Sequence, residues 1–313
     1  MPRRVAVQMD PLESVKFSHD SGVLLCKEAT RRGYEIHHYT PQDLAFREGK
    51  VLACARSVVF HDDLEKPYTA GEARLLDLSG VDVVLMRQDP PFDMGYITAT
   101  YILDMLNPKP LVVNNPAAVR NAPEKLFLFR FPQYVAPTMV SRDYEAIAGF
   151  LEAQGEIVLK PLYSFGGRSV FRLKKGDTNL RPTLDMFFAQ SSEPVIAQRF
   201  LPDIFTLEKR IILIDGQVTS YMARRAPPGQ IRTSANAGGS VGPYEPTPRD
   251  VEIAETVAKA MKEQDILLAS IDVIGDYLTE INVTSPSSLV DTNEMYGLKQ
   301  ERLVWDAIEK RLK

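Results

Sequence analysis

The chain has 313 residues, 44% of them hydrophobic, and a formal net charge of −4, which describes a folded protein of two or three subdomains and gives no reason to expect nucleic acid or a membrane as a partner. No apolar run approaches the roughly 20 residues of a membrane span, and the N-terminal segment lacks the apolar core of a signal peptide. The two cysteines, Cys26 and Cys54, are too few for a disulfide scaffold and fit a reducing compartment, so we expect a cytoplasmic protein.

The first third of the chain alternates predicted strands with predicted helices. Apolar runs of buried-strand type are separated by stretches with helical spacing, and Gly33 stands where the first helix should stop. Such alternation is typical of a parallel sheet covered by helices. No G-x-G-x-x-G motif follows the first strand, so the pattern does not indicate a dinucleotide site. The predicted strands are residues 3–9, 34–40, 81–87 and 110–115, and the predicted helices are residues 21–33 and 96–106.

The pattern changes from about residue 121 onward. A helix is predicted to close in residues 124–131, a later helix has Asp143 as its N-cap, and Asp215-Gly216 has the composition of a tight hairpin turn. Residues 226–248 are rich in Pro, Gly and Ser, and because they are long for a passive connection we expect a mobile active-site loop. The other predicted elements are strands at residues 136–141, 156–162 and 193–202, a helix at 143–155, and hairpins at 164–173 and 209–225.

Polar residues interrupt the apolar alternation of the stretch IDVIGDYLTEINVTSPSS, residues 271–288. If a hairpin turn centres on Asp276, Asp272 faces Glu280 across the two strands, and Asn282 points to the same side. Two facing carboxylates repel each other, so a cation would favour this register, and hard oxygen ligands suit Mg²⁺. A half-exposed strand produces the same alternation, and a turn shifted by one residue would separate the pair. Spacing alone leaves both explanations open.

Lys125 and Lys160 are candidate phosphate ligands, although most lysines are solvated surface residues. Lys160 ends a strand of buried type and is followed by Pro161 and by Gly166-Gly167. An ammonium group beside a glycine turn can hold polyphosphate, because the lysine supplies charge while glycine N–H groups approach the oxygens closely. The stretch SFGGRS is neither a Walker loop nor a Rossmann fingerprint, so this motif alone is not specific for phosphate.

Several arginines stand beside predicted strands. Taken singly, such residues most often form surface ion pairs. Arg87 and Arg210 each adjoin a buried-type strand, where a guanidinium is costly without a carboxylate or phosphate to bind. This placement indicates an anionic substrate. The other arginines of this group are Arg224 and Arg225 at a strand end and Arg232 in the long loop.

Together, in this order, these residues resemble the ATP-grasp superfamily and, within it, the bacterial glutathione synthetases. The resemblance runs almost from end to end and is carried by VAVQMDP, RRGYEIHHY, VLMRQDPPFD, ATYIL, NAPEKLF, VLKPL, FGGRSVF, AQRFLP, KRIILIDG, IDVIGDYLTEINVTSPS and WDAIEKRL. It implies an ATP-dependent ligase that joins γ-glutamylcysteine to glycine through an acyl phosphate on the cysteine carboxylate. The metal ion would be Mg²⁺, with Mn²⁺ as an alternative, and the family forms homo-oligomers, often tetramers.

The resemblance also implies an α/β fold with α+β subdomains. Residues 1–122 would form an N-terminal, substrate-binding pre-ATP-grasp domain built on a parallel sheet. Residues 123–313 would form an ATP-grasp domain with a glycine-rich lid. Within that domain, residues 123–200 would be the lid and nucleotide subdomain, and residues 201–313 the C-terminal catalytic subdomain with the mobile loop 226–248.

Carried over residue by residue, the resemblance assigns roles to most of the candidate residues. Asp272, Glu280 and Asn282 resemble the family's magnesium ligands, which favours the metal explanation of that hairpin. Arg210 and Lys160 would be catalytic, with Arg210 steadying the transferring phosphoryl group. The nucleotide would contact Lys125, Lys160, Gly166, Gly167, the adenine hinge Gln198, Arg199, Phe200 and Leu201, and the ribose carboxylate Glu208. The peptide and amine substrates would contact Arg87, Arg210, Arg225, Arg232, Ser285 and Ser287.

Two segments depart from the family pattern. The family usually has an Arg, an Asn two residues on, and then Gly-Gly-Arg, whereas RTSANAGGS has Ser234 at the Asn place and Ser240 at the final Arg place. The stretch SPSSLVDTNEMYG also differs from the family's threonine-containing run. Both departures lie on the substrate side, which keeps open a paralogue that ligates a different carboxylate or amine. A catalytically silent nucleotide-binding protein is the third alternative, but it would have no need of the metal ligands and lysines.

Overall fold

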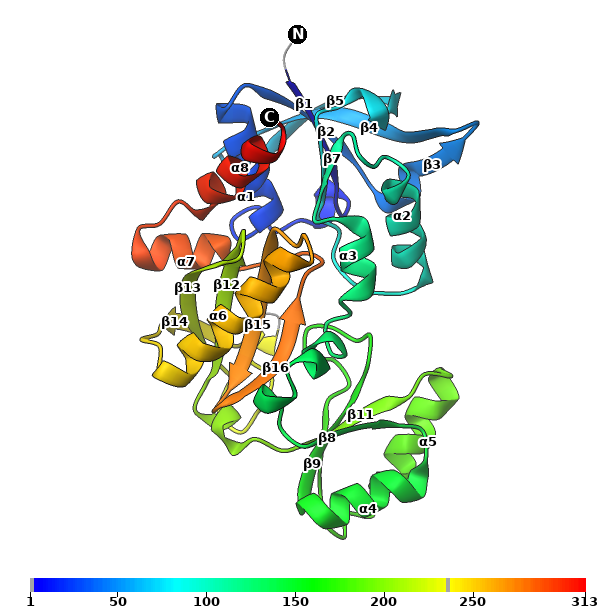
Figure 1. The fold of residues 1–313 in the computed structure, drawn as a ribbon, viewed down its shortest axis with the longest axis vertical. Helices are drawn as coiled ribbons and strands as arrows, with labels where there is room; N and C mark the ends of the chain where they lie inside the picture. Colours follow the sequence, from blue (N-terminus) through cyan, green and yellow to red (C-terminus); the bar gives the residue numbers. More distant parts are fainter. Residues whose placement is uncertain (1–2, 235–236) are drawn as a thin grey trace.

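The structure is a computed structural model and describes residues 3–234 and 237–313. Its strands form sheets of seven, four and five strands. In Figure 1 the seven-stranded N-terminal sheet lies at one end of the molecule, the five-stranded C-terminal sheet in the middle, and the four-stranded sheet at the other end. Within the described ranges, no helix combines the length and apolar character needed to span a membrane.

The N-terminal sheet is parallel over four strands, in the order β2-β1-β6-β7. This confirms the predicted parallel sheet with helices on both sides, since α1 and α8 lie on one side of it and α2 and α3 on the other (Figure 1). Coverage of both faces explains why these strands read as unbroken apolar runs. The elements are β1 (Arg3–Gln8), β2 (Tyr34–Tyr39), β6 (Val83–Met86), β7 (Leu111–Val113), α1 (Ser21–Arg31), α2 (Met94–Asp104), α3 (Pro116–Asn121) and α8 (Gln300–Arg311).

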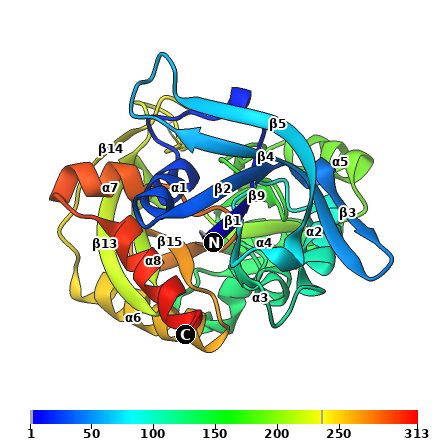
Figure 2. The same ribbon diagram turned by 90° about the horizontal axis from the view of Figure 1, so that it is seen from above.

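Three antiparallel strands extend this sheet and were not predicted from the sequence. They are β3 (Leu44–Arg47), β4 (Lys50–Phe60) and β5 (Tyr68–Asp77), and they cross the side of the molecule opposite α6 (Pro248–Glu263) in Figure 2. In the described part of the chain β5 pairs only with β4, and it is mostly exposed. It therefore lacks the continuous apolar face by which a strand can be identified from sequence. A register shift between Arg56 and Val58 also breaks the alternation of β4.

The four-stranded sheet is antiparallel in the order β10-β9-β11-β8 and has a hydrophobic core of its own. Asp143 accepts a hydrogen bond from the Ala146 N–H, which confirms the predicted N-cap of α4. The elements are β8 (Thr138–Ser141), β9 (Glu156–Pro161), β10 (Phe171–Lys174), β11 (Val195–Arg199), α4 (Tyr144–Gln154) and α5 (Leu180–Gln190).

The C-terminal sheet is antiparallel in the order β14-β13-β12-β15-β16, and α6 packs on one of its faces. Its core residues form common clusters with those of the N-terminal sheet. Asp215 and Gly216 have φ values of 48° and 77°, which confirms the predicted hairpin turn. The elements are β12 (Glu208–Ile214), β13 (Gln217–Arg225), β14 (Ser240–Pro243), β15 (Leu268–Ile274), β16 (Tyr277–Asn282) and α7 (Leu289–Tyr296).

Two expectations about connections need revision. The helix expected at residues 124–131 is a short 3₁₀ turn, Phe127–Arg130, because Pro132 disfavours α-helical geometry at the residue before it. The expected loop at 226–248 contains β14 and the capping box of α6 at Thr247, so it is partly regular structure. Ala235 and Asn236 of that loop lie outside the described residues.

Candidate active site

One face of the C-terminal sheet carries a row of charged residues across three adjacent strands. Arg210 on β12 lies opposite Asp272 on β15, and Asp272 lies opposite Glu280 on β16. Asn282 is two residues beyond Glu280 and points to the same face; its Nδ2 lies 3.4 Å from Asp272 Oδ2. The facing carboxylates expected from the sequence are therefore present.

A β-bulge produces this pairing, and the predicted turn centre is wrong. The turn consists of Gly275 and Asp276, so uninterrupted pairing would place Thr279 opposite Asp272. A register shift next to Asp272 adds a residue on β16 and restores Glu280 to the facing position.

Asp272 is held in place by two arginines. Its side chain is 1% exposed, and Arg210 binds both oxygens in fork geometry, with Nε 2.8 Å from Oδ1 and Nη2 2.6 Å from Oδ2. Arg224 Nη1 lies 3.4 Å from Oδ2. Burial alone would raise the pKa of Asp272, but the charges of Arg210 and Arg224 outweigh burial and hold that pKa below its ordinary value. Asp272 is thus an ionised carboxylate of fixed orientation.

The two candidate lysines lie beside this row. Lys125 Nζ donates to Glu124 Oε1 at 2.8 Å and to the Ser164 carbonyl, and it lies 4.0 Å from Glu280 Oε1. Lys160 is 7% exposed and forms no ion pair in the described part of the chain. Burial lowers the pKa of Lys160, and the charge of Glu280 opposes that effect. A buried ammonium group with so little compensation is suited to a phosphate oxygen.

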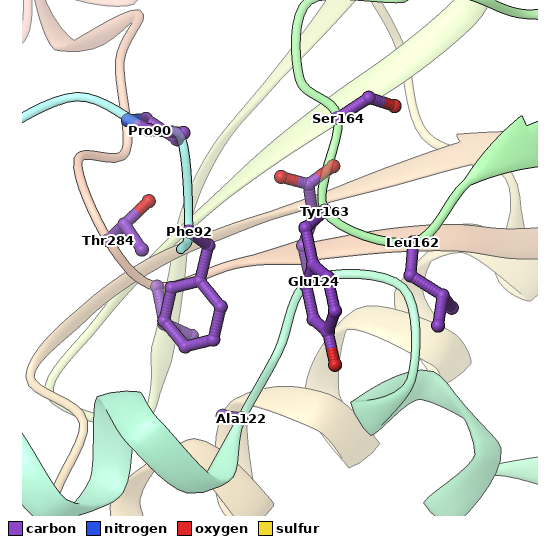
Figure 3. Close-up of a pocket in the computed structure, with 9 residues that line it drawn as sticks. Pro90, Phe92, Ala122, Glu124, Leu162, Tyr163, Ser164 and Thr284 are labelled. Carbon is purple, nitrogen blue, oxygen red and sulfur yellow. The ribbon is translucent and has the colours of Figure 1, made fainter. Parts of the chain in front are cut away.

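A small pocket of about 20 Å³ opens next to Lys125, where three parts of the chain meet (Figure 3). Its volume is about that of one water molecule, so a substrate enters only if a wall moves. The N-terminal domain, the glycine loop and the end of β16 each contribute walls. The lining residues are Pro90, Phe92, Ala122, Glu124, Leu162, Tyr163, Ser164, Val283 and Thr284.

The glycine loop touches the long loop. Gly166 and Gly167 have φ values of 64° and 68°, which a side chain would strain. The Gly166 carbonyl lies 3.4 Å from both Arg232 Nη2 and Ser234 Oγ. The structure therefore brings the predicted residue Arg232 to the predicted phosphate loop.

The predicted adenine hinge closes β11 and connects two sheets. Gln198 Nε2 donates to Thr138 Oγ1 at 2.9 Å, and the guanidinium carbon of Arg199 lies 5.0 Å from the Tyr277 ring centre. Phe200 and Leu201 are buried.

Glu208, the predicted ribose carboxylate, lies beside the charged row. Its Oε2 is 3.2 Å from Arg224 Nη1 and also accepts from the Thr233 hydroxyl. Burial raises the pKa of Glu208, Arg224 opposes this, and the charges of Asp272 and Glu280 add to it.

The sequence matches one family of known proteins over nearly its whole length. Residues 4–120 match the family model described as the N-terminal domain of prokaryotic glutathione synthetase, and residues 124–297 match the model of its ATP-grasp domain. The glutathione synthetase of Brucella melitensis is 43% identical over 311 residues, which are 99% of this chain and 100% of that protein. The chain belongs to the prokaryotic glutathione synthetase family.

Solved structures of ATP-grasp enzymes share the fold. D-cycloserine synthetase DcsG superposes with a TM-score of 0.69 at 15% identity, covering 97% of this chain and 99% of that one. The ATP-grasp ligase PsnB, in a complex with a precursor variant, Mg and ADP, has a TM-score of 0.64 at 17% identity, covering 99% and 98%. The expected α/β fold with an ATP-grasp domain is confirmed.

A glutathione synthetase of this family uses ATP and Mg²⁺, and the donor set fits a hard cation. Glu280 and the Asn282 Oδ1 accept no hydrogen bond from the described residues. The described ranges hold no group of three or more His, Cys, Asp or Glu that could bind a metal. Two carboxylates and one amide oxygen suffice for Mg²⁺, because this ion completes its octahedron with phosphate oxygens and water.

Most residues on the predicted substrate side come together around the segment Ser285–Ser287. Its contacts are Ser285 Oγ to Asp89 Oδ1 at 2.6 Å, Arg87 Nη2 to the Pro286 carbonyl at 2.9 Å, and Arg210 Nη1 to Ser287 Oγ at 3.1 Å. Two predicted residues lie elsewhere: Arg232 is at the glycine loop, and Arg225 is on the opposite face of its strand, because successive side chains of a strand point to opposite faces. Its neighbour Arg224 contacts Asp272, so Arg225 lies on the other face of β13.

Sequence reasoning did not assign Arg224 or Glu124 to the site. The sequence places Arg224 at a strand end, but strand alternation alone does not determine which of two adjacent arginines faces inward. Glu124 precedes Lys125 and bonds to it. Burial, followed by the charge of Glu280, raises the pKa of Glu124 to about 7. No sequence signal marks such a shift, since it arises from neighbours distant along the chain.

Proposed function

We propose that this protein joins the cysteine carboxylate of γ-glutamylcysteine to the amine of glycine and converts ATP to ADP and phosphate. The observation that carries the proposal is the row Arg210, Asp272 and Glu280, with Lys125 and Lys160 beside it. Phosphoryl transfer needs this combination of hard oxygen ligands and fixed cations, because its catalysis is mostly positioning and electrostatics.

In the first step, an oxygen of the cysteine carboxylate attacks the γ-phosphorus of ATP, the bond to the β,γ-bridging oxygen breaks, and ADP leaves. Lys125 and Lys160 hold the phosphate oxygens and offset their charge. Arg210 is oriented by Asp272 and extends Nη1 toward Ser287, where it steadies the acyl phosphate. Asp272, Glu280 and Asn282 would hold Mg²⁺, which would supply further charge compensation when bound.

In the second step, the glycine nitrogen attacks the carbonyl carbon of the acyl phosphate. The C–N bond forms, the C–O bond breaks, phosphate leaves with the electron pair, and the amine loses a proton. Water must be kept out, since it would hydrolyse the intermediate. We assign this task to loop 226–248 and the glycine loop, on the strength of the contact between Arg232 and Gly166.

The finer assignments are part of the same proposal. Residues 1–122 would bind substrate, residues 123–200 would form the lid, and residues 201–313 the catalytic subdomain; the separate core of the four-stranded sheet supports an independent lid. Gln198 to Leu201 would bind adenine and Glu208 the ribose. The family resemblance implies Mn²⁺ as an alternative to Mg²⁺ and a homo-oligomer, and the small number of cysteines fits a cytoplasmic protein.

Isotope transfer tests the acyl phosphate directly. γ-Glutamylcysteine labelled with ¹⁸O in its cysteine carboxylate should deliver one ¹⁸O atom to each phosphate released with the tripeptide. Unlabelled phosphate would contradict the mechanism. Ser234 and Ser240, which replace an amide and a guanidinium of the family pattern, favour a second candidate in which the acceptor is an amine other than glycine. The isotope result is the same for both, so the acceptor needs its own assay.

A further inference from the structure

Two carboxylates lie side by side at the carboxyl ends of the parallel neighbours β1 and β6. Gln8, the last residue of β1, pairs with Met86, the last residue of β6. The chain then continues to Asp10 and Asp89, where the Asp89 N–H donates to Asp10 Oδ2 at 2.9 Å. In open α/β sheets, ligands bind at this edge.

These carboxylates form no salt bridge in the described part of the chain, because no Lys, Arg or His nitrogen there lies within 4.0 Å of a carboxylate oxygen of Asp10 or Asp89. His38 Nε2 contacts the backbone carbonyl of Asp10 at 3.1 Å, and Arg87 acts on Asp89 from farther away. Burial raises the pKa of Asp10, and the charge of Asp89 raises it further. Two neighbouring negative charges repel each other, and a bound cation would relieve this repulsion.

Three buried polar atoms at the same edge have no hydrogen-bond partner among the described residues, and they are an independent sign of a ligand. They are Gln8 Oε1, Arg87 Nε and Tyr96 OH, on side chains that are 0%, 9% and 3% exposed. Arg87 and Tyr96 interact electrostatically with each other and with Asp89. Unpaired buried groups of both kinds, donor and acceptor, fit a polar ligand that carries both charges.

The polar cluster formed by Asp10, Asp89, Arg87 and Tyr96 lies about one dipeptide length from Arg210, where the reaction is proposed to occur. Ser285 bonds to Asp89 and Ser287 bonds to Arg210, and two residues of extended chain span at most about 7 Å. The pocket in Figure 3 is lined by Phe92 and by Thr284, which directly precedes this segment. When the cysteine carboxylate of γ-glutamylcysteine is at Arg210, its far end therefore reaches Asp89.

We propose that Asp10 and Asp89 bind the α-ammonium group of the γ-glutamyl residue, while Arg87 Nε and the Tyr96 hydroxyl donate to its α-carboxylate. This inference rests on the proposed function and specifies which acyl substrates the enzyme selects. It accepts acyl groups that carry a free α-amine. The only ammonium group of γ-glutamylcysteine is at the end far from the cysteine carboxylate. A subsite that binds this group would distinguish γ-glutamylcysteine from other thiol-containing acids.

The test compares γ-glutamylcysteine with glutarylcysteine, which lacks only the α-amine. For the wild-type protein, kcat/KM for glutarylcysteine should be about 10- to 100-fold lower, the scale of one charged hydrogen bond. Asp89→Asn and Asp10→Asn should lower kcat/KM for γ-glutamylcysteine by about the same factor and leave that for glutarylcysteine within about threefold. Equal use of both substrates by the wild type, or parallel losses in the variants, would overturn the inference.

Ser285→Ala is the matched control, because it removes the hydrogen bond to Asp89 and keeps the carboxylate. It should affect both substrates alike, and a selective loss of γ-glutamylcysteine in this variant would refute the role of charge. Calorimetric binding of the two compounds in the presence of a non-hydrolysable ATP analogue separates this inference from the proposed function. Preferential binding of γ-glutamylcysteine without any ligation would sustain the subsite and contradict the activity; equal binding would contradict the subsite.

Discussion

Asp272 and Glu280 face each other, yet they have different partners, and this difference makes their roles separable. Both should be essential for ligation, because an amide in place of a carboxylate binds Mg²⁺ more weakly and leaves phosphate charge uncompensated. We expect Asp272→Asn and Glu280→Gln each to lower the rate of ADP formation at least about a hundredfold at saturating Mg²⁺. Near-normal turnover in both variants would show that the metal assignment is wrong.

Unfolding in urea without Mg²⁺ is the control that separates a loss of activity from a loss of stability in these two variants. Asp272→Asn breaks the fork with Arg210 and should cost about 3 kcal/mol, the scale of a broken buried ion pair. Glu280 accepts no hydrogen bond from the described residues, so Glu280→Gln should cost little while abolishing activity.

The raised pKa of Glu124 predicts a specific pH dependence of the protein's stability. Its pKa is raised to about 7 by burial and then by the charge of Glu280, whereas an unfolded Glu titrates near about 4.3. A raised pKa in the folded state stabilises the protein fully below the unfolded pKa, and this stabilisation is lost as pH rises toward about 7. The Tm of the metal-free protein should therefore fall more steeply between about pH 5 and 7 than that of Glu124→Gln. Parallel profiles would contradict the raised pKa.

At the scale of elements, Asn114 joins β7 of the N-terminal sheet to the C-terminal sheet. Its Oδ1 accepts from the N–H groups of Leu267 and Leu268, and its Nδ2 donates to the carbonyls of Leu268 and Val283, at 2.7–3.0 Å. Asn114→Ala leaves these buried groups unpaired and should cost about 3 kcal/mol or more in urea unfolding. The adjacent N-cap variant Asn115→Ala should cost only about 1 kcal/mol. Similar costs would argue against the bridging role.

The contact between the two loops combines the long side chain of Arg232 with the short side chain of Ser234. Ser234 Oγ reaches the Gly166 carbonyl only at 3.4 Å, and Ser240 opens the exposed strand β14. Restoring the family residues with Ser234→Asn and Ser240→Arg should tighten closure and lower the ratio of ADP to tripeptide formed. An unchanged ratio would show that these serines do not limit protection of the acyl phosphate.

Elements with strong local signals were predictable from the sequence, and elements governed by their partners were not. The Asp215-Gly216 turn follows from residues that accept positive φ, and α4 follows from its N-cap. The bulge that aligns Asp272 with Glu280 depends on how β15 and β16 pair, which no single strand encodes. The exposed strand β5 lacks the alternation that would reveal it.

The same distinction holds for the candidate site. The family resemblance named the residues of the charged row, whereas which side chains face that row follows from strand register. This is why Arg224 faces Asp272 although Arg225 was the predicted substrate contact, and why the proximity of Glu124 to Glu280 emerges only in three dimensions.

For the whole molecule, the distribution of cores indicates which parts move together. The N-terminal and C-terminal sheets share hydrophobic clusters, whereas the four-stranded sheet packs on its own. A unit with its own core can change position without breaking the rest. We therefore expect the four-stranded sheet to carry Lys160 and the glycine loop as one unit relative to the C-terminal sheet, which holds Arg210, Asp272 and Glu280.

The measurement that tests the central claim most directly follows product and ADP together. The protein is given ATP, Mg²⁺ and γ-glutamylcysteine with each of a panel of small amines. We predict that glycine has the highest kcat/KM of the panel and that each tripeptide formed is matched by close to one ADP, because the closed loops protect the acyl phosphate. Tight coupling to another amine, with glycine inactive, would contradict the assignment and identify a ligase for a different acceptor.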